Sequence, residues 1–531
     1  MFLSLFGGWF LKKIGTESSE ITNFLLMIFV FLYPIYFILN YISLPSPHDT
    51  LIRKVQISVG IVWITYLFLF LIFAVKKLIF LKKGNLSKLY GFLALYLFLG
   101  VTIFTAAVCE LSGDEPHYLL MAQSLVHDGD LDLSNNYQNR DFLSFYHRGD
   151  LDPQALEHMV DGKRYSHHPL GPVLLVLPGF ALLGRMGAAL TIVLLAALTL
   201  YWTLRVLEET GAKGWALHAT GVIGLFSSPL LLFSGLIYPE IPTACLVALS
   251  LLLYIKKRWA WFGLCQGLML WMHNRNVLLV LPFLLFAGYE ILENKKNRWQ
   301  EMGRGVFGFG IPVLLLSFYF YSIYGVFTPL GAHNEPFTSL FRLSHFWDGF
   351  FGLLFDQECG LWFHFPIFAL MVLGGFILYR SSNPLRFLVL GVFSFFYLFM
   401  SFYENLGLTP ATRYMVGVTP LLLFMLYPAV EKIQKHPRWM KLAGFLLIVG
   451  VLVNWILAAI PWMRYNKMDG ENWILKITGN FLHMPLTSFW PSFNPAVVQP
   501  HSYVISVFWV GLVIALTVWF LKDKKTKGRN N

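Results

Sequence analysis

The sequence predicts an all-α polytopic membrane protein with about fourteen transmembrane helices, from its composition and from the spacing of its apolar runs. Of its 531 residues, 56% are hydrophobic and only 13% are charged, and the mean hydropathy is +0.60. A soluble domain is about a quarter charged. The composition therefore excludes an ordinary soluble enzyme and a disordered chain.

Apolar runs long enough to cross a bilayer, about 20 residues in a helix, recur along the chain. The first three predicted spans are 21–43, 56–74 and 89–109, and a polar stretch follows at 110–169. The later predicted spans are 186–206, 215–236, 241–255, 259–272, 277–292, 305–324, 363–379, 385–402, 415–427, 441–460 and 503–521.

The apolar segment 170–183 is too short to count as a span, because it has only about fourteen residues. It also contains Pro172 and Pro178. Counting it as a span would move the basic cluster at Lys256 to the opposite side of the membrane. We expect this segment to lie at the outer surface as a short interfacial helix.

Clusters of basic residues fix the expected orientation. They contain Lys12 and Lys13; Lys76, Lys77, Lys82, Lys83 and Lys88; Lys256, Lys257 and Arg258; Lys295, Lys296 and Arg298; Lys432, Lys435, Arg438 and Lys441; and Lys522, Lys524, Lys525, Lys527 and Arg529. All fall on one side if the spans alternate, which is the positive-inside pattern of a multi-pass protein of the plasma (inner) membrane. The net charge of +11 therefore indicates topology and not nucleic-acid binding.

Three parts are expected along the chain: a transmembrane hairpin at 1–88, a membrane core at 89–430 and C-terminal helices with a basic tail at 431–531. The core includes a large first extracytoplasmic loop at 110–169, in which short interfacial helices are expected. This loop holds eleven acidic and four basic residues, so its net charge is 4 − 11 = −7. Four long polar loops are expected at the outer face: 110–169, 325–362, 404–412 and 464–501. The catalytic or binding chemistry is therefore expected at that face.

The segment Asp114-Glu115-Pro116-His117-Tyr118 is the most informative part of this loop. Proline favours the first turn of a helix, so a short helix is expected to begin at Pro116. Asp114 stands where a helix-capping residue belongs. It can equally act as a catalytic base, held ionised by the positive end of the helix. The residues alone leave both roles open.

Two arginines at predicted span ends are candidates for holding a phosphate, because a guanidinium pairs with it bidentately. They are Arg275, in a tight outer turn, and Arg413, at the start of a span. The alternative for both is that the long side chain only reaches toward the interface.

Further polar residues have both functional and structural explanations. Glu240 lies at an outer turn and can bind a substrate hydroxyl or simply be solvated. The same choice holds for the sequence Asp356-Gln357-Glu358, which could bind a sugar or a cation. His167 and His168 could hold a divalent cation together with nearby acids, although no cofactor is required by the sequence. A phosphate-binding glycine loop for nucleotides does not occur.

The run 114–118 at the outer end of an early span resembles the acidic first-loop motif of the GT-C glycosyltransferases. This superfamily includes protein O-mannosyltransferases and lipid A aminoarabinose transferases. Residues 165–172 resemble the segment that closes that loop, and Arg413-Tyr414 followed by Pro420 is similar to a late motif. The resemblance covers about 89–420. Some relatives have a lysine where His167 and His168 stand, and the first two spans look like an addition to the family core.

The resemblance implies a glycosyltransferase that moves a sugar from a polyprenyl-phosphate donor to a lipid, glycan or protein acceptor, with inversion at the anomeric carbon. It implies Asp114 as general base, with Glu115 as the second candidate. The expected site also contains residues for the donor phosphate and for substrate. The phosphate-binding residues are Arg275, Arg413, His167 and His168, and the substrate-binding residues are Tyr118, Glu240 and Tyr414.

Two other functions remain open from the sequence. A transporter or flippase of lipid-linked saccharides would place polar residues near the midplane of the membrane, whereas the charges here gather at span ends. A membrane ligase that moves whole glycans from pyrophosphate carriers would use the same outer face. Donor preference, monophosphate against pyrophosphate, distinguishes the ligase from the glycosyltransferase.

Overall fold

A computed structural model describes residues 58, 60–72, 85–157, 162–294, 296–328, 342–403, 411–464, 469–494 and 501–527. Seven of the described helices are long and apolar enough to cross a membrane: Leu86–Val108, Leu170–Glu209, Gly214–Phe233, Asn274–Glu293, Arg298–Tyr324, Pro437–Ala459 and His501–Lys522. Shorter apolar helices cover Gly60–Ile72, Glu240–Ile255, Pro366–Tyr379 and Arg386–Met400. The prediction of an all-α membrane protein is confirmed. The number of fourteen spans stays a prediction, and the first predicted span, 21–43, lies outside the described residues.

Helices make up most of both halves of the chain. The first half contains α4 (Leu86–Val108), α5 (Glu115–His127), α6 (Ser134–Gln138), η1 (Asp141–Ser144), β1 (Ala155–Glu157), β2 (Arg164–Ser166), α7 (Leu170–Glu209), α8 (Gly214–Phe226), α9 (Pro229–Phe233), α10 (Glu240–Ile255), α11 (Trp259–Met272), η2 (Asn274–Asn276) and α12 (Val277–Glu293). The second half contains α13 (Arg298–Tyr324), η5 (Leu343–His345), α14 (Phe346–Phe355), α15 (Leu361–His364), η6 (Pro366–Leu370), α16 (Met371–Tyr379), α17 (Arg386–Met400), α18 (Arg413–Val416), α19 (Thr419–Ile433), α20 (Pro437–Ala459), η7 (Pro461–Arg464), α21 (Trp473–Leu482), η8 (Leu486–Phe489) and α22 (His501–Lys527).

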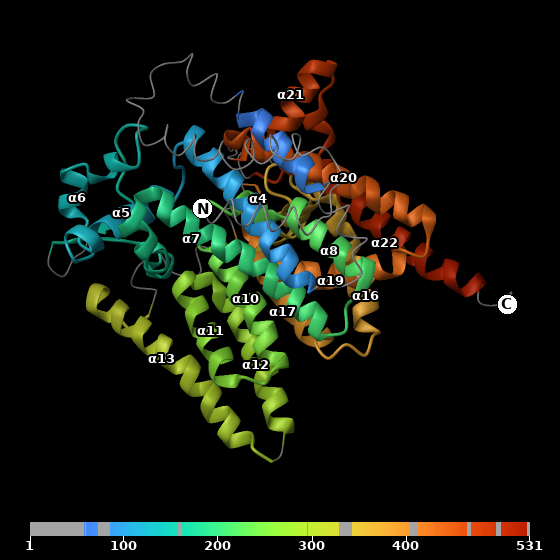
Figure 1. Ribbon diagram of the computed structural model, residues 1–531, viewed down its shortest axis with the longest axis horizontal. Helices are drawn as coiled ribbons and strands as arrows, with labels where there is room; N and C mark the ends of the chain where they lie inside the picture. The colour runs from blue at the N-terminus through green and yellow to red at the C-terminus, as the bar shows by residue number, and fades with distance from the viewer. Residues whose placement is uncertain are drawn as a thin grey trace, which may run out of the picture.

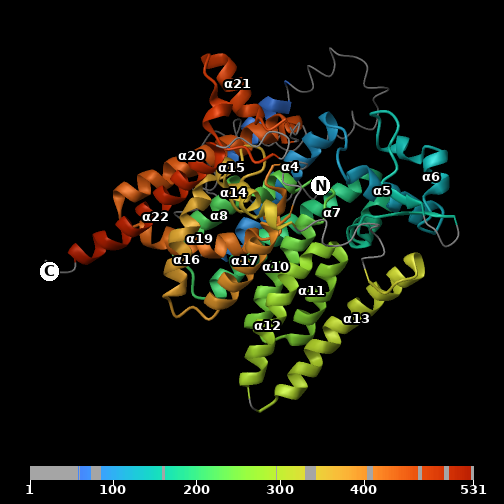
Figure 2. The ribbon, with the colours of Figure 1, turned by 180° about the vertical axis from the view of Figure 1, so that it is seen from behind.

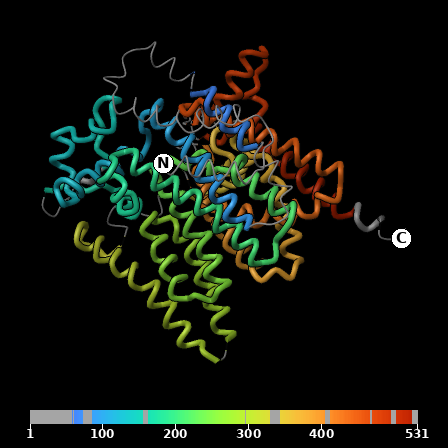
Figure 3. Tube along the Cα trace, viewed as in Figure 1, coloured from blue at the N-terminus to red at the C-terminus, as the bar shows by residue number. Residues whose placement is uncertain are grey.

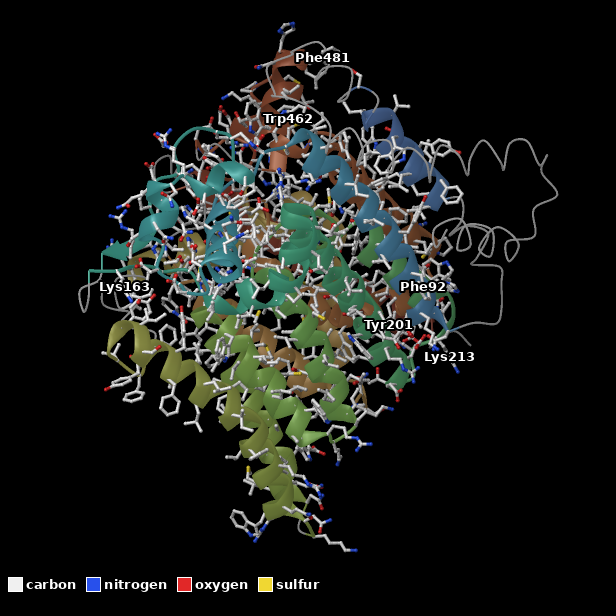
Figure 4. The ribbon with its side chains drawn as sticks, turned by 60° about the vertical axis from the view of Figure 1, so that its left-hand side comes forward. Phe92, Lys163, Tyr201, Lys213, Trp462 and Phe481 are labelled. Atoms are coloured by element: carbon white, nitrogen blue, oxygen red, sulfur yellow. The ribbon has the colours of Figure 1, made fainter. Side chains whose placement is uncertain are left out.

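The helices form three groups around a shared core. Helices α5 and α6 lie at one edge of the molecule, and α16, α20 and α22 lie at the opposite edge in both views (Figure 1, Figure 2). Helices α11, α12 and α13 extend together away from the centre (Figure 3). Helices α4 and α7 pack closely, since a Cβ atom on Gly91 would lie 3.0 Å from the Cβ of Tyr201. Figure 4 shows Phe92 and Tyr201 near each other on one face.

The long polar loop is folded. It contains the expected short helices α5 and α6 and also a two-stranded antiparallel sheet, in which Ala155 pairs with Ser166 and Glu157 with Arg164. The sheet was not expected, because its strands have only three residues each and strands of this length leave little alternation in the sequence. Helix α5 begins one residue earlier than expected, at Glu115, with Pro116 in its first turn.

Helix α7 consists of two helical stretches that turn sharply against each other. Leu183 and Gly184 have non-helical backbone angles, and Gly184 has a φ of 56°. A Cβ atom on Gly187 would lie 1.9 Å from the carbonyl oxygen of Gly179. Eight residues of continuous helix rise about 12 Å, so this contact requires the chain to reverse. The expectation that 170–183 is separate from the span after it is confirmed.

The contact between α11 and α13 is built on small residues. A Cβ atom on Gly263 would lie 2.2 Å from the carbonyl oxygen of Gly305, and one on Gly308 would lie 2.0 Å from that of Ala260. The Trp271 indole also donates to the carbonyl oxygen of Pro312 across this contact, at 2.8 Å. Close approach through small residues is a common way for helices to associate in membranes.

Replacing Gly308 by leucine is expected to force α11 and α13 apart. Overpacking of a tight contact costs about 1–3 kcal/mol, so the thermal midpoint of the detergent-solubilised protein should fall by several degrees. Gly310→Leu is the matched control, because a Cβ atom there meets no atom within 4 Å. Equal melting temperatures for the two variants would contradict the packing of these two helices.

Candidate functional site

The turn that carries Asp114 is held by Tyr238. Gly113 has a φ of 61°, in the left-handed region that glycine tolerates. The Tyr238 hydroxyl donates to the carbonyl oxygen of Ser112 at 3.1 Å. A Cβ atom on Gly113 would lie 2.3 Å from that hydroxyl. The turn therefore needs glycine both for its backbone conformation and for the space that Tyr238 occupies.

Asp114 pairs with Arg413, a residue 299 positions away in the sequence. The Nη2 atom of Arg413 donates to Oδ2 of Asp114 at 2.6 Å, and both side chains are largely buried. Asp114 makes no capping hydrogen bond with its side chain. The capping role suggested by its position is therefore wrong, since the carboxylate bonds to Arg413 and only the backbone of Asp114 starts the helix.

Glu240 brings the second arginine into the same cluster. Its Oε1 atom accepts from Nε of Arg413 at 2.8 Å and also pairs with Arg275. The guanidinium of Arg413 thus bridges Asp114 and Glu240. The two carboxylates and two guanidinium groups have a formal charge of 2 − 2 = 0. Among the described residues, the buried Oε2 atom of Glu240 has no hydrogen-bond partner.

Each arginine also lies over a tyrosine ring. The guanidinium carbon of Arg413 is 4.5 Å from the ring centre of Tyr238, and that of Arg275 is 5.1 Å from the ring centre of Tyr414. A cation over an aromatic face is stabilised by the ring quadrupole. Tyr414, expected to bind substrate, therefore also supports Arg275.

The backbone that presents Arg413 is strained. Thr412 has a φ of 63°, and a β-branched residue rarely adopts the left-handed region. The preceding Ala411 donates its N–H to the carbonyl oxygen of Arg464 at 3.0 Å. Strained residues of this kind occur often at functional sites, where the surrounding structure holds them.

The neighbouring arginines keep Asp114 ionised. Burial raises the pKa of this carboxyl group, but the charge and hydrogen bond of Arg413, together with the charge of Arg275, hold its pKa below the ordinary value of 3.8. Asp114 is therefore a carboxylate at neutral pH. It is also a weak proton acceptor as long as Arg413 stays bound to it.

Histidine rings pack beside this cluster. His117 stacks on His168 with ring centres 5.3 Å apart, and Tyr118 lies 5.2 Å from His168. His168 also bonds to Gln154 through Nε2 at 2.8 Å, and its ring lies 4.5 Å from that of His167. Burial lowers the pKa of His117 to about 4 and that of His168 to about 3. At pH 7 His168 is therefore neutral and could contact a phosphate only as a neutral N–H donor, so its place in a phosphate site stays a prediction.

These buried histidines should make the protein less stable in mild acid. A depressed pKa means that the unfolded chain binds more protons, so the stability contribution of His117 is full above pH 6.5 and is lost as the pH falls toward about 4. The slope is at most about 1.4 kcal/mol per pH unit for one histidine. His117→Phe should flatten the dependence of melting temperature on pH, and His127→Phe, at an exposed position, should not. If the melting temperature of His117→Phe depended on pH as steeply as that of the wild type, protonation of His117 would not be the cause of the acid sensitivity.

Glu115 contacts a different part of the protein from Asp114. Its Oε1 atom accepts from the N–H of Ile237 at 2.9 Å and its Oε2 atom from that of Ser112 at 3.4 Å. The carboxylate joins the start of α5 to the turn before α10. This gives Glu115 a structural explanation beside its candidacy as a second base.

The sequence Asp356-Gln357-Glu358 forms an internal anchor. Asp356 accepts from the N–H groups of Glu358, Cys359 and Phe493 at 2.7, 2.9 and 2.7 Å. Gln357 bonds to the backbone of Thr487 and Trp490. These side chains hold the segment 469–494 in place, and their polar atoms are engaged in doing so. For Asp356 and Gln357 this structural role stands in place of both alternatives left open by the sequence, the sugar or cation contact and the solvated loop, because both side chains are buried.

Within the described ranges, no group of three or more His, Cys, Asp or Glu side chains is arranged to hold a metal ion. His167 and His168 lie among aromatic rings, with Asp114 bound to Arg413. The geometry of these residues therefore does not form the divalent-cation site considered from the sequence.

The sequence missed Tyr238, Gly113 and Thr412 as site residues. Tyr238 stands two positions before Glu240 at the same helix start, and a large aromatic residue there was a usable signal. Gly113 directly precedes Asp114, and a glycine before a helix start often marks a positive φ. Nothing in the sequence distinguishes Thr412 from an ordinary loop threonine.

The structure brings Asp114, Glu240, Arg275, Arg413 and Tyr414 together, and it places Tyr118 and His168 beside them. They come from the start of α5, the start of α10, η2 and α18, and His168 comes from the turn between β2 and α7. A comparison with models of known protein families, with curated proteins and with solved structures finds no match for this chain.

Proposed function

We propose that this chain is an integral-membrane glycosyltransferase that moves a sugar from a polyprenyl-phosphate donor to an acceptor hydroxyl at the outer face of the membrane. The observation that supports the proposal is the pairing of a buried carboxylate, Asp114, with Arg413, next to the second pair of Glu240 and Arg275. A base beside two guanidinium groups suits a reaction in which a hydroxyl loses a proton while a phosphate departs.

Asp114 acts as the general base. Its carboxylate accepts the proton of the acceptor hydroxyl as that oxygen attacks the anomeric carbon of the sugar. The bond between this carbon and the phosphate oxygen breaks at the same time, so the configuration inverts. The carboxylate becomes neutral, and the donor phosphodiester, with one negative charge, becomes a lipid phosphate with two.

Arg413 and Arg275 hold the phosphate and stabilise the second charge as it develops. In the resting structure both guanidinium groups are occupied by carboxylates. A bound phosphate competes for Arg413 and draws it away from Asp114. Asp114 then loses the contact that depresses its pKa, so donor binding increases the strength of the base.

Glu240 contributes at two points. It keeps the two arginines close together through Oε1, which spares them from mutual repulsion when no phosphate is present. Its Oε2 atom, which is buried and has no partner among the described residues, suits a hydroxyl group of the sugar or of the acceptor. Tyr118 and Tyr414 line the same region as substrate-binding candidates.

The test is a transfer assay with the purified full chain in lipid nanodiscs. Radiolabelled polyprenyl-phosphate sugars are supplied with lipid, glycan and peptide acceptors. We expect label to move to an acceptor with release of polyprenyl phosphate. Transfer from pyrophosphate-linked glycans alone would support a glycan ligase. Movement of the lipid-linked sugar across proteoliposomes, with no product formed, would support a flippase and overturn the proposal.

A further inference from the structure

A large apolar cavity lies between helices on the side of the molecule away from α5. Its volume is about 510 Å³, and its walls come from η6, α16, α20, α21 and α22 and from the segment around α15. Helices α16, α20 and α22 lie side by side in both ribbon views, at the edge opposite α5 and α6 (Figure 1, Figure 2). None of the lining residues belongs to the candidate glycosyltransferase site.

The chemistry of the walls selects an apolar ligand. Of the described lining residues only Thr517 is not hydrophobic, and none is charged. A cavity with such walls does not hold water, and an empty one loses the dispersion contacts of every lining atom. An apolar molecule in the cavity would restore these dispersion contacts, so an apolar ligand is expected to bind there.

The shape of the cavity indicates a long ligand. On α20 the lining residues run from Trp439 to Val453, which corresponds to roughly 21 Å of helix at 1.5 Å per residue. This is about two thirds of the hydrocarbon thickness of a bilayer. An extended alkyl chain matches this length, whereas a compact ligand would leave most of the cavity empty.

The cavity opens toward the lipid. Only 28% of the apolar window of α20 and 11% of that of α22 are buried inside the protein. Phe445 lines the cavity and is 62% exposed. Tryptophans are found at both ends, with Trp439 in the first turn of α20 and Trp490 beside η8. Tryptophan is the residue that gathers at membrane interfaces.

The charges beside the cavity indicate the headgroup. Ile474 and Leu475 of α21 line the cavity, and the next residue, Lys476, forms ion pairs with Asp469 and Glu471. These three charges at the α21 end of the cavity sum to 1 − 2 = −1, whereas the exposed basic residues Arg438 and Lys441 flank the lining residues Trp439 and Leu442 at the other end. A headgroup at the α21 end meets this mixed set of charges with a net charge of −1, which disfavours an anionic headgroup and suits one that carries an ammonium group.

We propose that this cavity binds one acyl chain of a zwitterionic glycerophospholipid with an ammonium headgroup, at a site separate from the one assigned to sugar transfer. The lipid completes the packing of α16, α20 and α22 in the bilayer. The occupant differs from the polyprenyl carrier, because the paired arginines suited to a phosphate lie on α18 and η2 and no arginine is among the described residues that line the cavity.

The test compares two neighbouring residues on α20. Val449 lines the cavity, whereas Ile448 is 59% exposed and does not. The full chain is delipidated in detergent, titrated with palmitoyl-oleoyl phosphatidylethanolamine and studied by native mass spectrometry. The wild-type protein and Ile448→Trp should bind one lipid tightly. Val449→Trp, which fills the cavity, should weaken this binding by at least about tenfold.

Two results would overturn the proposal. One is equal occupancy in Val449→Trp and Ile448→Trp, and the other is preferential binding of polyprenyl phosphate over phosphatidylethanolamine by the cavity. If Val449→Trp does not yield a monodisperse protein, Ala369→Leu fills the same cavity from η6 and provides the comparison. Sugar transfer by the cavity variants should stay at the level of Ile448→Trp, so this test is independent of the proposed activity.

Discussion

Asp114→Asn should reduce sugar transfer by about 10²–10⁴-fold, the usual contribution of a general base. The amide has almost the same shape as the carboxylate and can still accept the hydrogen bond from Arg413, but it cannot take the proton of the acceptor hydroxyl. The loss should therefore appear in kcat, with little change in KM for the donor. Transfer is measured with labelled donor and purified protein of unchanged helical content.

The control for this variant is an acid from the same loop. Asp152 is exposed, and Asp152→Asn changes the loop charge by the same amount without touching Arg413. It should transfer sugar at the wild-type rate. A wild-type rate for Asp114→Asn would reject Asp114 as the base. If Glu115→Gln then lost about 10²–10⁴-fold in transfer rate, Glu115 would be assigned as the base instead.

Arg413→Met should destabilise the protein by about 3–5 kcal/mol, because removal of one partner from a buried ion pair leaves the other charge unsatisfied. Glu240 is only 3% exposed and would keep Arg275 as its single partner, while Asp114 would lose its ion pair. The thermal midpoint should fall strongly, and transfer should be lost. Arg148→Met, at an exposed position, is the control and should melt like the wild type.

A double substitution separates the charge effect from the loss of packing. Asp114→Asn in the Arg413→Met background removes the carboxylate that has lost its ion-pair partner, while Glu240 keeps its pair with Arg275. Part of the stability should return, so the two changes should not be additive. Additive losses would mean that Arg413 stabilises the protein through its contact with Tyr238 and not through the bridge.

The candidate residues could be selected from the sequence because charge is scarce in this chain. A charged side chain at the end of an apolar run is costly unless it has a partner or a function, which draws attention to Asp114, Glu240, Arg275 and Arg413. Which of them meet depends on helix packing over as many as 299 residues. The residues next to each charged side chain in the sequence do not show which charged partner it meets in the folded protein.

Neighbouring residues show the same limit. Asp114 and Glu115 are adjacent, and the sequence ranks them only by resemblance. In the structure one carboxylate meets Arg413 and the other the N–H of Ile237, because successive residues at a helix start point in different directions. His168 looks like a cation in sequence, but its burial between His117 and Tyr118 keeps it neutral.

The sequence predicted those features of the fold that depend on the length and composition of an apolar segment. The separation of 170–183 from the following span follows from its length and its prolines, and the structure has the break at Gly184. The two-stranded sheet in the polar loop was not predictable. Its strands have only three residues each, and such short strands form because the two segments pair with each other and not because of a pattern within either one. The division of one apolar segment into two short helices, as in α8 and α9, likewise depends on a local turn. A hydropathy profile does not reveal such a turn.

The bridge at Arg413 imposes an order on biogenesis. Arg275 follows Glu240 by 35 residues, so this pair can form within one newly inserted hairpin. Asp114 must wait for Arg413, 299 residues later, while most of the intervening helices enter the membrane. A nascent chain that stops before Arg413 holds an uncompensated carboxylate at the membrane boundary. The charge cluster therefore cannot be complete before the chain has been synthesised as far as α18.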